Sequence, residues 1–277
     1  MTISSGDKER DLRHLVNNFT APALAAALRD RDETLRVCAR LAAAGEDGAL
    51  RELLKPYQTS KLRAEPARSS VAAWGDDLFG AAHREEMRRR LQRMPRQLTK
   101  ATAKRASVLI PLCHYRGAPA VLFTNRSDAV GTHKREVCFP GGMVDTTDRS
   151  IIETGLRELH EEIGIDKQQV DVLGVMRCDW SEVASITGVG VTPVLGYIGE
   201  LSTLQLQPSA EVAGWFAVPI ADIIGAQNWV LRDFSAPVFT GGAPHVVWGL
   251  TAYLLANVVR SVLGGEVGAD PVKNMGF

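Results

Sequence analysis

The sequence predicts an α/β fold in which helices and a mixed β-sheet form a sandwich, preceded by a mostly helical N-terminal region. Three observations predict this fold class. The first 80 residues are rich in Ala and Leu and lack the alternation typical of strands. From residue 106 onward, short apolar runs separated by turns indicate strands. Two or three helical segments interrupt these strands, which follow one another as hairpins and not as βαβ units.

Residues 1–80 are predicted to form a helical extension. Good helix formers fill residues 23–29, 33–44 and 46–54, and a looser connector is expected over residues 59–70. Residues 84–105 then carry nine basic residues against Glu85 and Glu86, a net charge of +7. This stretch is predicted to be an exposed amphipathic helix and linker, and contact with an anionic membrane or partner is the alternative. We expect the extension to serve either as a partner module or as the interface of a homodimer.

The strands are predicted from residue 106 onward. Residues 107–113 and 120–124 flank the turn Arg116-Gly117-Ala118-Pro119, which indicates a hairpin. A glycine-rich turn over residues 139–142 leads into a helix over residues 150–163. Further strands are expected at residues 170–177, 188–197 and 212–218, and helices at residues 219–227 and 248–263. We therefore expect one α/β domain over residues 84–265, followed by a tail over residues 266–277.

The composition is that of an ordinary globular protein and excludes several classes. Lys and Arg number 32 and so do Asp and Glu, so the net charge is zero, whereas a nucleic-acid-binding protein usually carries a basic excess. The longest apolar stretch, residues 246–259, is shorter than the ~20 residues of a membrane-spanning helix. Four cysteines without a CxxC spacing argue against structural zinc and against a disulfide scaffold. With no secretory signal visible, we expect an intracellular protein, cytoplasmic or mitochondrial.

The segment from Gly142 to Ile165 carries the chemistry. On a helix over residues 150–163, one apolar stripe faces the core, and Glu158, Glu161 and Glu162 fall on the other side. Glu158 and Glu162 are four residues apart, so their like charges repel unless a divalent cation lies between them. The stripe consists of Ile152, Leu156, Leu159 and Ile163.

The residues around these glutamates favour a metal site over the alternative, a solvated acidic face on an amphipathic helix. Arg157 can orient a carboxylate through a bidentate pair. Ser150 and Glu153 form a capping box at the start of the helix, and Gly164 ends it as a C′ residue. Two glycines before the helix allow the preceding loop to approach a ligand closely, namely Gly141 and Gly142.

The segment resembles the Nudix box, whose pattern is G-x5-E-x7-R-E-U-x-E-E-x-G-U, with U a bulky aliphatic residue. Residues 157–165 match the second half of the pattern completely. In the first half the spacing from Gly142 to Arg157 is one residue longer, and Asp148 stands where the first Glu is expected.

This departure is similar to the coenzyme A pyrophosphatase branch of the Nudix hydrolases, in which Asp145 and Asp148 match a GG-x-x-D-x-x-D pattern. The branch also has an upstream pattern, from which Phe123, Gly131 and Arg135 depart. The likeness covers about residues 84–265 and is nearest to mitochondrial-type eukaryotic members. The upstream residues that match are Leu122, Thr124, Arg126, Ser127 and the run from Phe139 to Gly142.

The resemblance implies a Nudix α/β/α sandwich and hydrolysis of the diphosphate of coenzyme A or acyl-CoA, to 3′,5′-ADP and (acyl-)4′-phosphopantetheine. It implies Mg²⁺ or Mn²⁺ bound by Glu158 and Glu162, with Glu161 binding a further ion directly or through water, and Arg157 beside them. The general base is either a glutamate of the box or an acid on a distant loop, for which Glu211 is a candidate. The predicted substrate contacts are Arg126, Lys134, Arg135, Gly141 and Gly142.

Two other functions remain open. A Nudix hydrolase could act on NADH, ADP-ribose or a nucleotide sugar instead of coenzyme A. A non-catalytic binding or scaffold protein could use the same fold, although such proteins usually lose the carboxylates that this chain keeps. A transition-metal site at His133 and Cys138, or adenine stacking on Trp180 or Trp248, is a weaker interpretation than a loop or core role.

Overall fold

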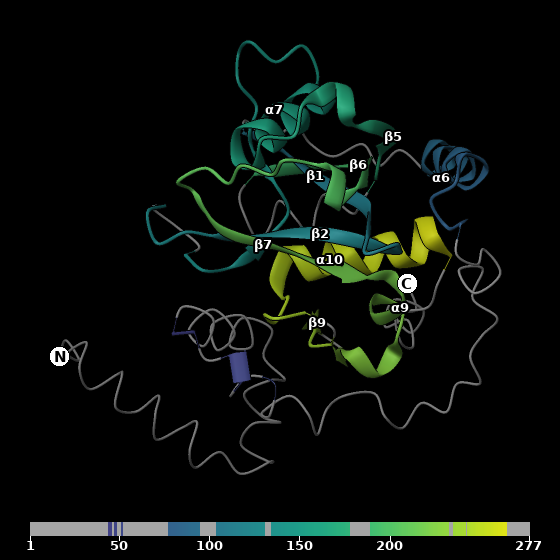
Figure 1. Cartoon of the computed structure of the whole chain (residues 1–277), viewed down its shortest axis with the longest axis vertical. Coiled ribbons are helices and arrows are strands. Elements are labelled where there is room, and N and C mark those ends of the chain that lie inside the picture. Colours follow the sequence, from purple (N-terminus) through teal and green to yellow (C-terminus); the bar gives the residue numbers. More distant parts are fainter. Residues whose placement is uncertain are drawn as a thin grey trace, which may run out of the picture.

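The computed structural model describes residues 44–45, 47–48, 51, 77–94, 104–130, 134–177, 189–232, 235–241 and 243–264. Apart from the few described positions before residue 81, the helices predicted in residues 1–80 lie outside these ranges. So does the predicted tail over residues 266–277. In the described part, two layers of helices enclose a mixed seven-stranded sheet, and a two-stranded sheet lies beside it (Figure 1). The predicted α/β fold with a mixed sheet is confirmed.

The predicted hairpin forms from β1 (Arg105–Tyr115) and β2 (Ala118–Arg126), which pair antiparallel. The turn is shorter than predicted, because Pro119 already pairs with His114. The opposite edge of β1 pairs in parallel with β6 (Gly190–Glu200), and β5 (Asp171–Val175) is antiparallel to β6. On its far edge β2 pairs with β7 (Val212–Pro219).

Two short strands fill the space where β1 and β2 diverge. Strand β3 (Val137–Cys138) pairs with the end of β2, and β4 (Gly141–Met143) pairs with the start of β1. The prediction of a glycine-rich turn over residues 139–142 is therefore wrong, because Gly141 and Gly142 lie in a strand opposite Val108 and Ser107. A side chain at Gly141 would place its Cβ 2.7 Å from Val108 Cα, so the close pairing requires glycine there.

Helices cover both faces of the sheet. Helix α7 (Ile151–Ile163) lies on one face, and α10 (Gly249–Asn257), which continues as the π-helical turn η6 (Val258–Leu263), lies on the other (Figure 1). Alternation along β1 supplies both cores: Leu109 packs into the cluster that contains α7, and Ile110 into the cluster that contains α10. Packing against this face of the sheet thus fixes the position of α7.

Helix α6 (Ala81–Arg93) forms where the charge run predicts an amphipathic helix, and its outer face is exposed as expected. The other face packs on the domain: Met87 and Leu91 are buried. Arg84 pairs with Asp171 of β5 at 2.8 Å, and Arg88 pairs with the same carboxylate. Residues 95–103, the predicted linker, lie outside the described residues. None of the described helices is both long and apolar enough to cross a membrane.

The remaining elements are short. Helix α9 (Ile220–Ile223) is much shorter than the helix predicted over residues 219–227. Strands β8 (Trp229–Arg232) and β9 (Ser235–Phe239) form an antiparallel hairpin that the sequence did not predict. Single helical turns occur at η3 (Lys167–Gln169), η4 (Leu201–Thr203) and η5 (Ala226–Asn228).

Candidate metal and diphosphate site

Helix α7 carries the predicted metal-binding glutamates, and local signals set both of its ends. The Ser150 hydroxyl accepts the Glu153 N–H at 3.2 Å, as a capping residue should. The Glu153 carboxylate accepts the N–H of Arg149 at 2.9 Å, so the second bond of the predicted capping box falls one residue earlier. Gly164 ends the helix with a left-handed φ of 79°, as predicted.

The predicted apolar stripe of α7 faces the sheet. Leu159 and Ile163 are completely buried, and Ile152 and Leu156 pack partly buried against the same cluster. The sequence predicts that the three glutamates share one exposed side of the helix, and this prediction is wrong. Instead, each of the three lies in a different environment, and this difference decides what each carboxylate can do.

Glu162 is the buried member, with only 6% of its surface exposed. The backbone N–H of Gly141 donates to its Oε1 at 3.4 Å, while Oε2 has no hydrogen-bond partner among the described residues. Burial raises the pKa of Glu162 to about 7, and the negative charge of Glu158 adds to the rise. A buried acid with one unsatisfied oxygen is costly unless a ligand or proton reaches it.

Glu158 lies partly buried against the same strand, β4, with 16% of its side chain exposed. A Cβ on Gly142 would lie 2.6 Å from the Glu158 Cδ, so glycine lets the β4 backbone approach this carboxylate without displacing it. Burial raises the pKa of Glu158, whereas the adjacent Arg157 lowers it. The two predicted substrate-binding glycines therefore contact the predicted metal ligands: Gly141 contacts Glu162, and Gly142 contacts Glu158.

Glu161 faces solvent, with 56% of its side chain exposed. Nη1 of Arg157 donates to Glu161 Oε2 at 3.0 Å and to Glu158 Oε1 at 2.8 Å. Arg157 thus connects the exposed carboxylate with the half-buried one. As predicted from its type and position, Arg157 orients carboxylates of the box.

The bidentate partner of Arg157 is Asp148, the residue at the variant first position of the box. Nε and Nη2 of Arg157 donate to the two Asp148 oxygens at 3.0 and 3.1 Å. The hydroxyl of Thr154 and the N–H of Asp145 also donate to Oδ2, at 2.8 and 2.9 Å. These bonds, led by those from Arg157, lower the pKa of Asp148 to about 2.

The role of Asp148 was missed by sequence reasoning, since nine residues separate it from Arg157 and it precedes the helix. Helical periodicity therefore does not pair the two residues. The one available signal was that an acid occupies this position at all.

Glu211 comes from the turn before β7, far along the chain from α7. The Glu211 carbonyl accepts the N–H of Ser127 at 2.7 Å, which holds this turn beside the end of β2. The charge of Glu211 contributes to the raised pKa of both Glu158 and Glu162. The structure thus brings the candidate base within electrostatic range of the predicted metal ligands.

The predicted phosphate-binding cations divide into two groups. The positive charge of Arg126 opposes the rise in the pKa of Glu162, and its buried Nε has no hydrogen-bond partner among the described residues. Lys134 and Arg135 are exposed, and Arg135 forms a bidentate pair with Asp128, at 3.0 Å from Nε and 2.8 Å from Nη2. Arg126 therefore lies at the acidic site, while Arg135 lies on the loop beyond it.

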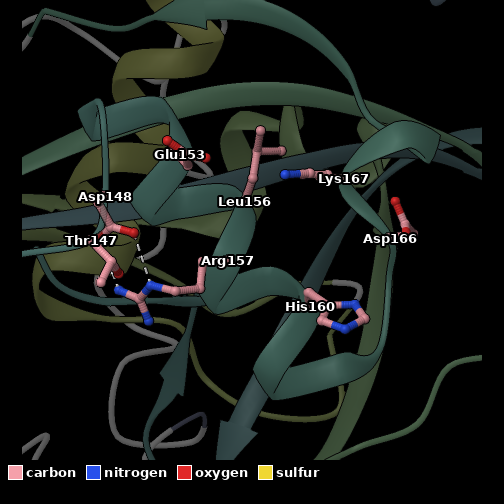
Figure 2. A pocket seen from close by; sticks show the side chains of 8 residues that line it. All are labelled: Thr147, Asp148, Glu153, Leu156, Arg157, His160, Asp166 and Lys167. Carbon is pink, nitrogen blue, oxygen red and sulfur yellow. Dashed lines mark hydrogen bonds and ion pairs between the residues drawn. The ribbon is translucent and has the colours of Figure 1, made fainter. Parts of the chain in front are cut away.

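A cavity of about 370 Å³ opens beside α7 (Figure 2). It reaches the ion pair between Arg157 and Asp148 at one end and Lys167 at the other. The three box glutamates do not line it, so this cavity is not the predicted metal site. Its lining residues are Thr147, Asp148, Glu153, Leu156, Arg157, His160, Asp166 and Lys167.

The residues at the acidic site fit a hard divalent cation. Two carboxylates approach each other there, and the free oxygen of Glu162 and the free Nε of Arg126 are buried polar atoms that lack partners within the described ranges. Oxygen ligands of this kind suit Mg²⁺ and Mn²⁺. Across the part of the chain that the structure describes, no three His, Cys, Asp or Glu side chains are already grouped around one point. Arg157 holds Glu158 and Glu161, so both carboxylates would have to share their oxygens between Arg157 and a metal.

The weaker sequence interpretations gain no support. Cys113 and Cys138 are free, lie in strands, and have pKa values that burial raises. Trp248 occupies the N-cap position of α10 without a side-chain capping bond and is partly buried. His133 and Trp180 lie outside the described residues.

Comparison with known proteins identifies the family. A profile of the NUDIX domain matches residues 103–239. The mitochondrial coenzyme A diphosphatase NUDT8 of Homo sapiens is 40% identical over 178 residues, which cover 58% of this chain and 73% of that protein. The protein of the same name from Mus musculus is 37% identical over 68% of this chain and 92% of its own length. An uncharacterized Nudix hydrolase NudL of Photorhabdus laumondii subsp. laumondii is 34% identical over 57% of this chain and 85% of its own. With relatives of this identity, of which it covers 73% and more, the chain belongs to the Nudix family.

Proposed function

We propose that this Nudix hydrolase cleaves the diphosphate linkage of coenzyme A or acyl-CoA to 3′,5′-ADP and (acyl-)4′-phosphopantetheine. The observation that carries the metal chemistry is the buried Glu162, whose free oxygen lies beside Glu158 and Arg126. The substrate class is supported by the relatives named coenzyme A diphosphatases, of which this chain covers 73% and 92%.

Glu158 and Glu162 would hold Mg²⁺ or Mn²⁺, with Glu161 binding directly or through water. Bound there, the cation supplies charge neutralisation for the diphosphate and a bound water of lowered pKa. The residues of this chain prepare the site beforehand. Arg157 restrains the carboxylates of Glu158 and Glu161, and Asp148 fixes the guanidinium in turn.

Substrate binding is assigned to the loops around the acidic site. The buried Nε of Arg126 is suited to donate to a phosphate oxygen, since it has no other hydrogen-bond partner within the described part of the chain. Lys134 and Arg135 would bind phosphate farther out, and Arg135 would have to exchange Asp128 for the substrate. Gly141 and Gly142 would contact the substrate through their backbone groups, since Val108 and Glu158 fill the space that a side chain would take at each.

Glu211 is our candidate for the general base. It is the acid outside the box whose charge reaches both predicted metal ligands. Its carboxylate would accept the proton of the attacking water, while Glu158 and Glu162 would hold the metal. Glu211→Gln should lower kcat strongly and leave the affinity for Mg²⁺ nearly unchanged.

The domain assignment follows the same logic. We assign catalysis to residues 84–265, because α6 and the helices α10 and η6 pack into the core beyond the ends of the family match. The compartment is proposed to be mitochondrial or cytoplasmic, and cell fractionation decides between the two. Sedimentation of the full chain decides whether it forms a homodimer.

A substrate panel tests this function. The full chain is incubated with Mg²⁺ and with coenzyme A, acetyl-CoA, NADH, ADP-ribose or a nucleotide sugar, and products are identified by mass. We expect the highest kcat/KM for a coenzyme A substrate. High turnover of ADP-ribose or NADH with coenzyme A untouched would contradict the proposed substrate but leave the Nudix chemistry intact. No turnover of any substrate would favour the scaffold alternative.

A further inference from the structure

The N-terminal region contacts the domain at a defined place, the loop between β9 and α10. Asp47 Oδ1 accepts the backbone N–H of Val246 at 2.9 Å, and its Oδ2 lies 2.9 Å from Nδ1 of His245. These contacts join residues that are almost 200 positions apart in the sequence. One carboxylate therefore holds both a backbone group and a side chain of the loop.

Arg51 makes a second anchor on the same loop. Its guanidinium donates to the carbonyl oxygens of Thr240 and Ala243, the latter at 2.5 Å. Ala243 and Val246 are buried, at 9% and 2% exposure, so their backbone groups need hydrogen-bond partners within the protein. Asp47 and Arg51 provide those partners. The docking is thus part of how the loop is stabilised and not an incidental surface contact.

Gly45, two residues before Asp47, lies beside Arg135, one of the predicted substrate contacts. Gly45 has a left-handed φ of 71°, and a Cβ built there would lie 3.8 Å from Nη1 of Arg135. The Arg135 N–H in turn donates to the carbonyl of Arg126 at 3.0 Å. The segment therefore lies beside the loop that connects Arg126 at the acidic site with the outer cation Arg135.

Ring contacts lead from the anchored loop towards the metal site. The ring of His245 lies tilted at 5.7 Å from that of Phe216, which stacks on Phe123 at 5.4 Å. Phe123 stacks on Phe139 at 5.0 Å. Phe139 lies two residues before Gly141, whose N–H bonds to Glu162. Side-chain packing thus reaches from His245 to the strand that contacts Glu162.

We propose that Gly45, Asp47 and Arg51 belong to the substrate site: held in place through Asp47 and Arg51, this part of the chain borders Arg135 and helps to orient the anionic substrate there. This inference rests on the proposed hydrolysis of a nucleoside diphosphate. It assigns the segment a role in substrate affinity and specificity, because the segment lies beside the outer cation and away from the carboxylates of α7.

Anchor variants of the full chain test the inference. Asp47→Ala removes both contacts, whereas Asp47→Asn keeps an oxygen that can accept the Val246 N–H. Arg51→Ala removes the second anchor. Glu85→Gln on α6, an exposed acid that pairs with Arg88 at 3.4 Å, is the control. Hydrogen exchange at the Val246 amide reports docking without any reference to activity, and KM and kcat for coenzyme A report the site.

We expect Asp47→Ala and Arg51→Ala to speed exchange around Val246 and raise KM about tenfold, with kcat within about twofold of wild type. Asp47→Asn should restore most of the lost affinity, and Glu85→Gln should change neither readout. Faster exchange with unchanged KM would overturn the inference, as would exchange in Asp47→Ala equal to wild type. If coenzyme A is not hydrolysed at all, the affinity for 3′,5′-ADP, measured by calorimetry, replaces KM. A tenfold weaker binding of 3′,5′-ADP by Asp47→Ala would then support a role of these residues in ligand binding, even though the proposed reaction had failed.

Discussion

Replacing Glu162 by glutamine should stabilise the protein at alkaline pH while it slows the reaction by about 10²–10³-fold. Burial raises the pKa of Glu162 from its ordinary 4.5 to about 7. The folded state therefore binds its proton more tightly than the unfolded state, and stability falls as the pH rises from 4.5 through 7. A shift of this size corresponds to about 3 kcal/mol. A buried glutamine amide without a partner costs about 1–2 kcal/mol in return. A net gain of about 1–2 kcal/mol should remain at pH 8.

Urea denaturation at pH 5 and pH 8, in EDTA and in Mg²⁺, measures this gain. In EDTA we expect Glu162→Gln to be more stable than wild type at pH 8, and the difference to shrink or reverse at pH 5. Mg²⁺ should stabilise the wild type at pH 8 and leave the variant unchanged, because a cation relieves the buried charge only where the charge exists. Glu161→Gln is the matched control, since its 56% exposed side chain should give a difference below about 1 kcal/mol. A variant less stable than wild type at both pH values would refute this account of Glu162.

The remaining predictions concern the residues that hold the glutamates in place. Asp148→Asn should cost about 1–2 kcal/mol at pH 7, because the neutral amide loses the bidentate ion pair with Arg157. The cost stays modest because the Arg157 side chain is 26% exposed and solvent screens its charge in part. The pKa of Asp148 near 2 means that this contribution is present above pH 3.8 and is lost as the pH falls towards 2, which denaturation at pH 7 and pH 3 would reveal. Arg157→Lys cannot form the bidentate pair, so kcat should fall at saturating Mg²⁺ while the helix content by circular dichroism stays constant. Gly142→Ala would displace the Glu158 carboxylate and lower kcat by ~10²-fold, whereas Gly214→Ala, where a Cβ meets no atom within 4 Å, should have little effect. Equal kinetics in the two glycine variants would contradict the close approach at Gly142.

Local signals explain why α7 could be predicted almost to the residue. Ser150 and Gly164 mark its ends, and the apolar stripe between them fixes the face that Leu159 buries. The box residues follow from the same short segment. A hairpin such as β1 and β2 is equally local, because its strands adjoin and its turn contains Gly117.

Features that depend on distant partners could not be predicted. Gly141 reads as a turn residue until β1, more than thirty positions earlier, pairs with it. The burial of Glu162 depends on the same strand, β4, whose Gly141 N–H bonds to it. The position of Glu211 depends on the pairing of β7 with β2. Strand β9 contains Pro237, which argues against a strand in sequence-based reasoning, and the hairpin is stabilised by tertiary contacts of Trp229, whose indole N–H donates to Ile223 O at 2.6 Å.

The most direct test of the central claim compares wild type and Glu162→Gln on coenzyme A, with products weighed by mass spectrometry. In Mg²⁺ the wild type should release 3′,5′-ADP and 4′-phosphopantetheine, and in EDTA it should release neither. The variant should be slower by about 10²–10³-fold in Mg²⁺. Equal release of both products by wild type and variant, or by wild type with and without Mg²⁺, would contradict a metal-dependent hydrolysis centred on α7.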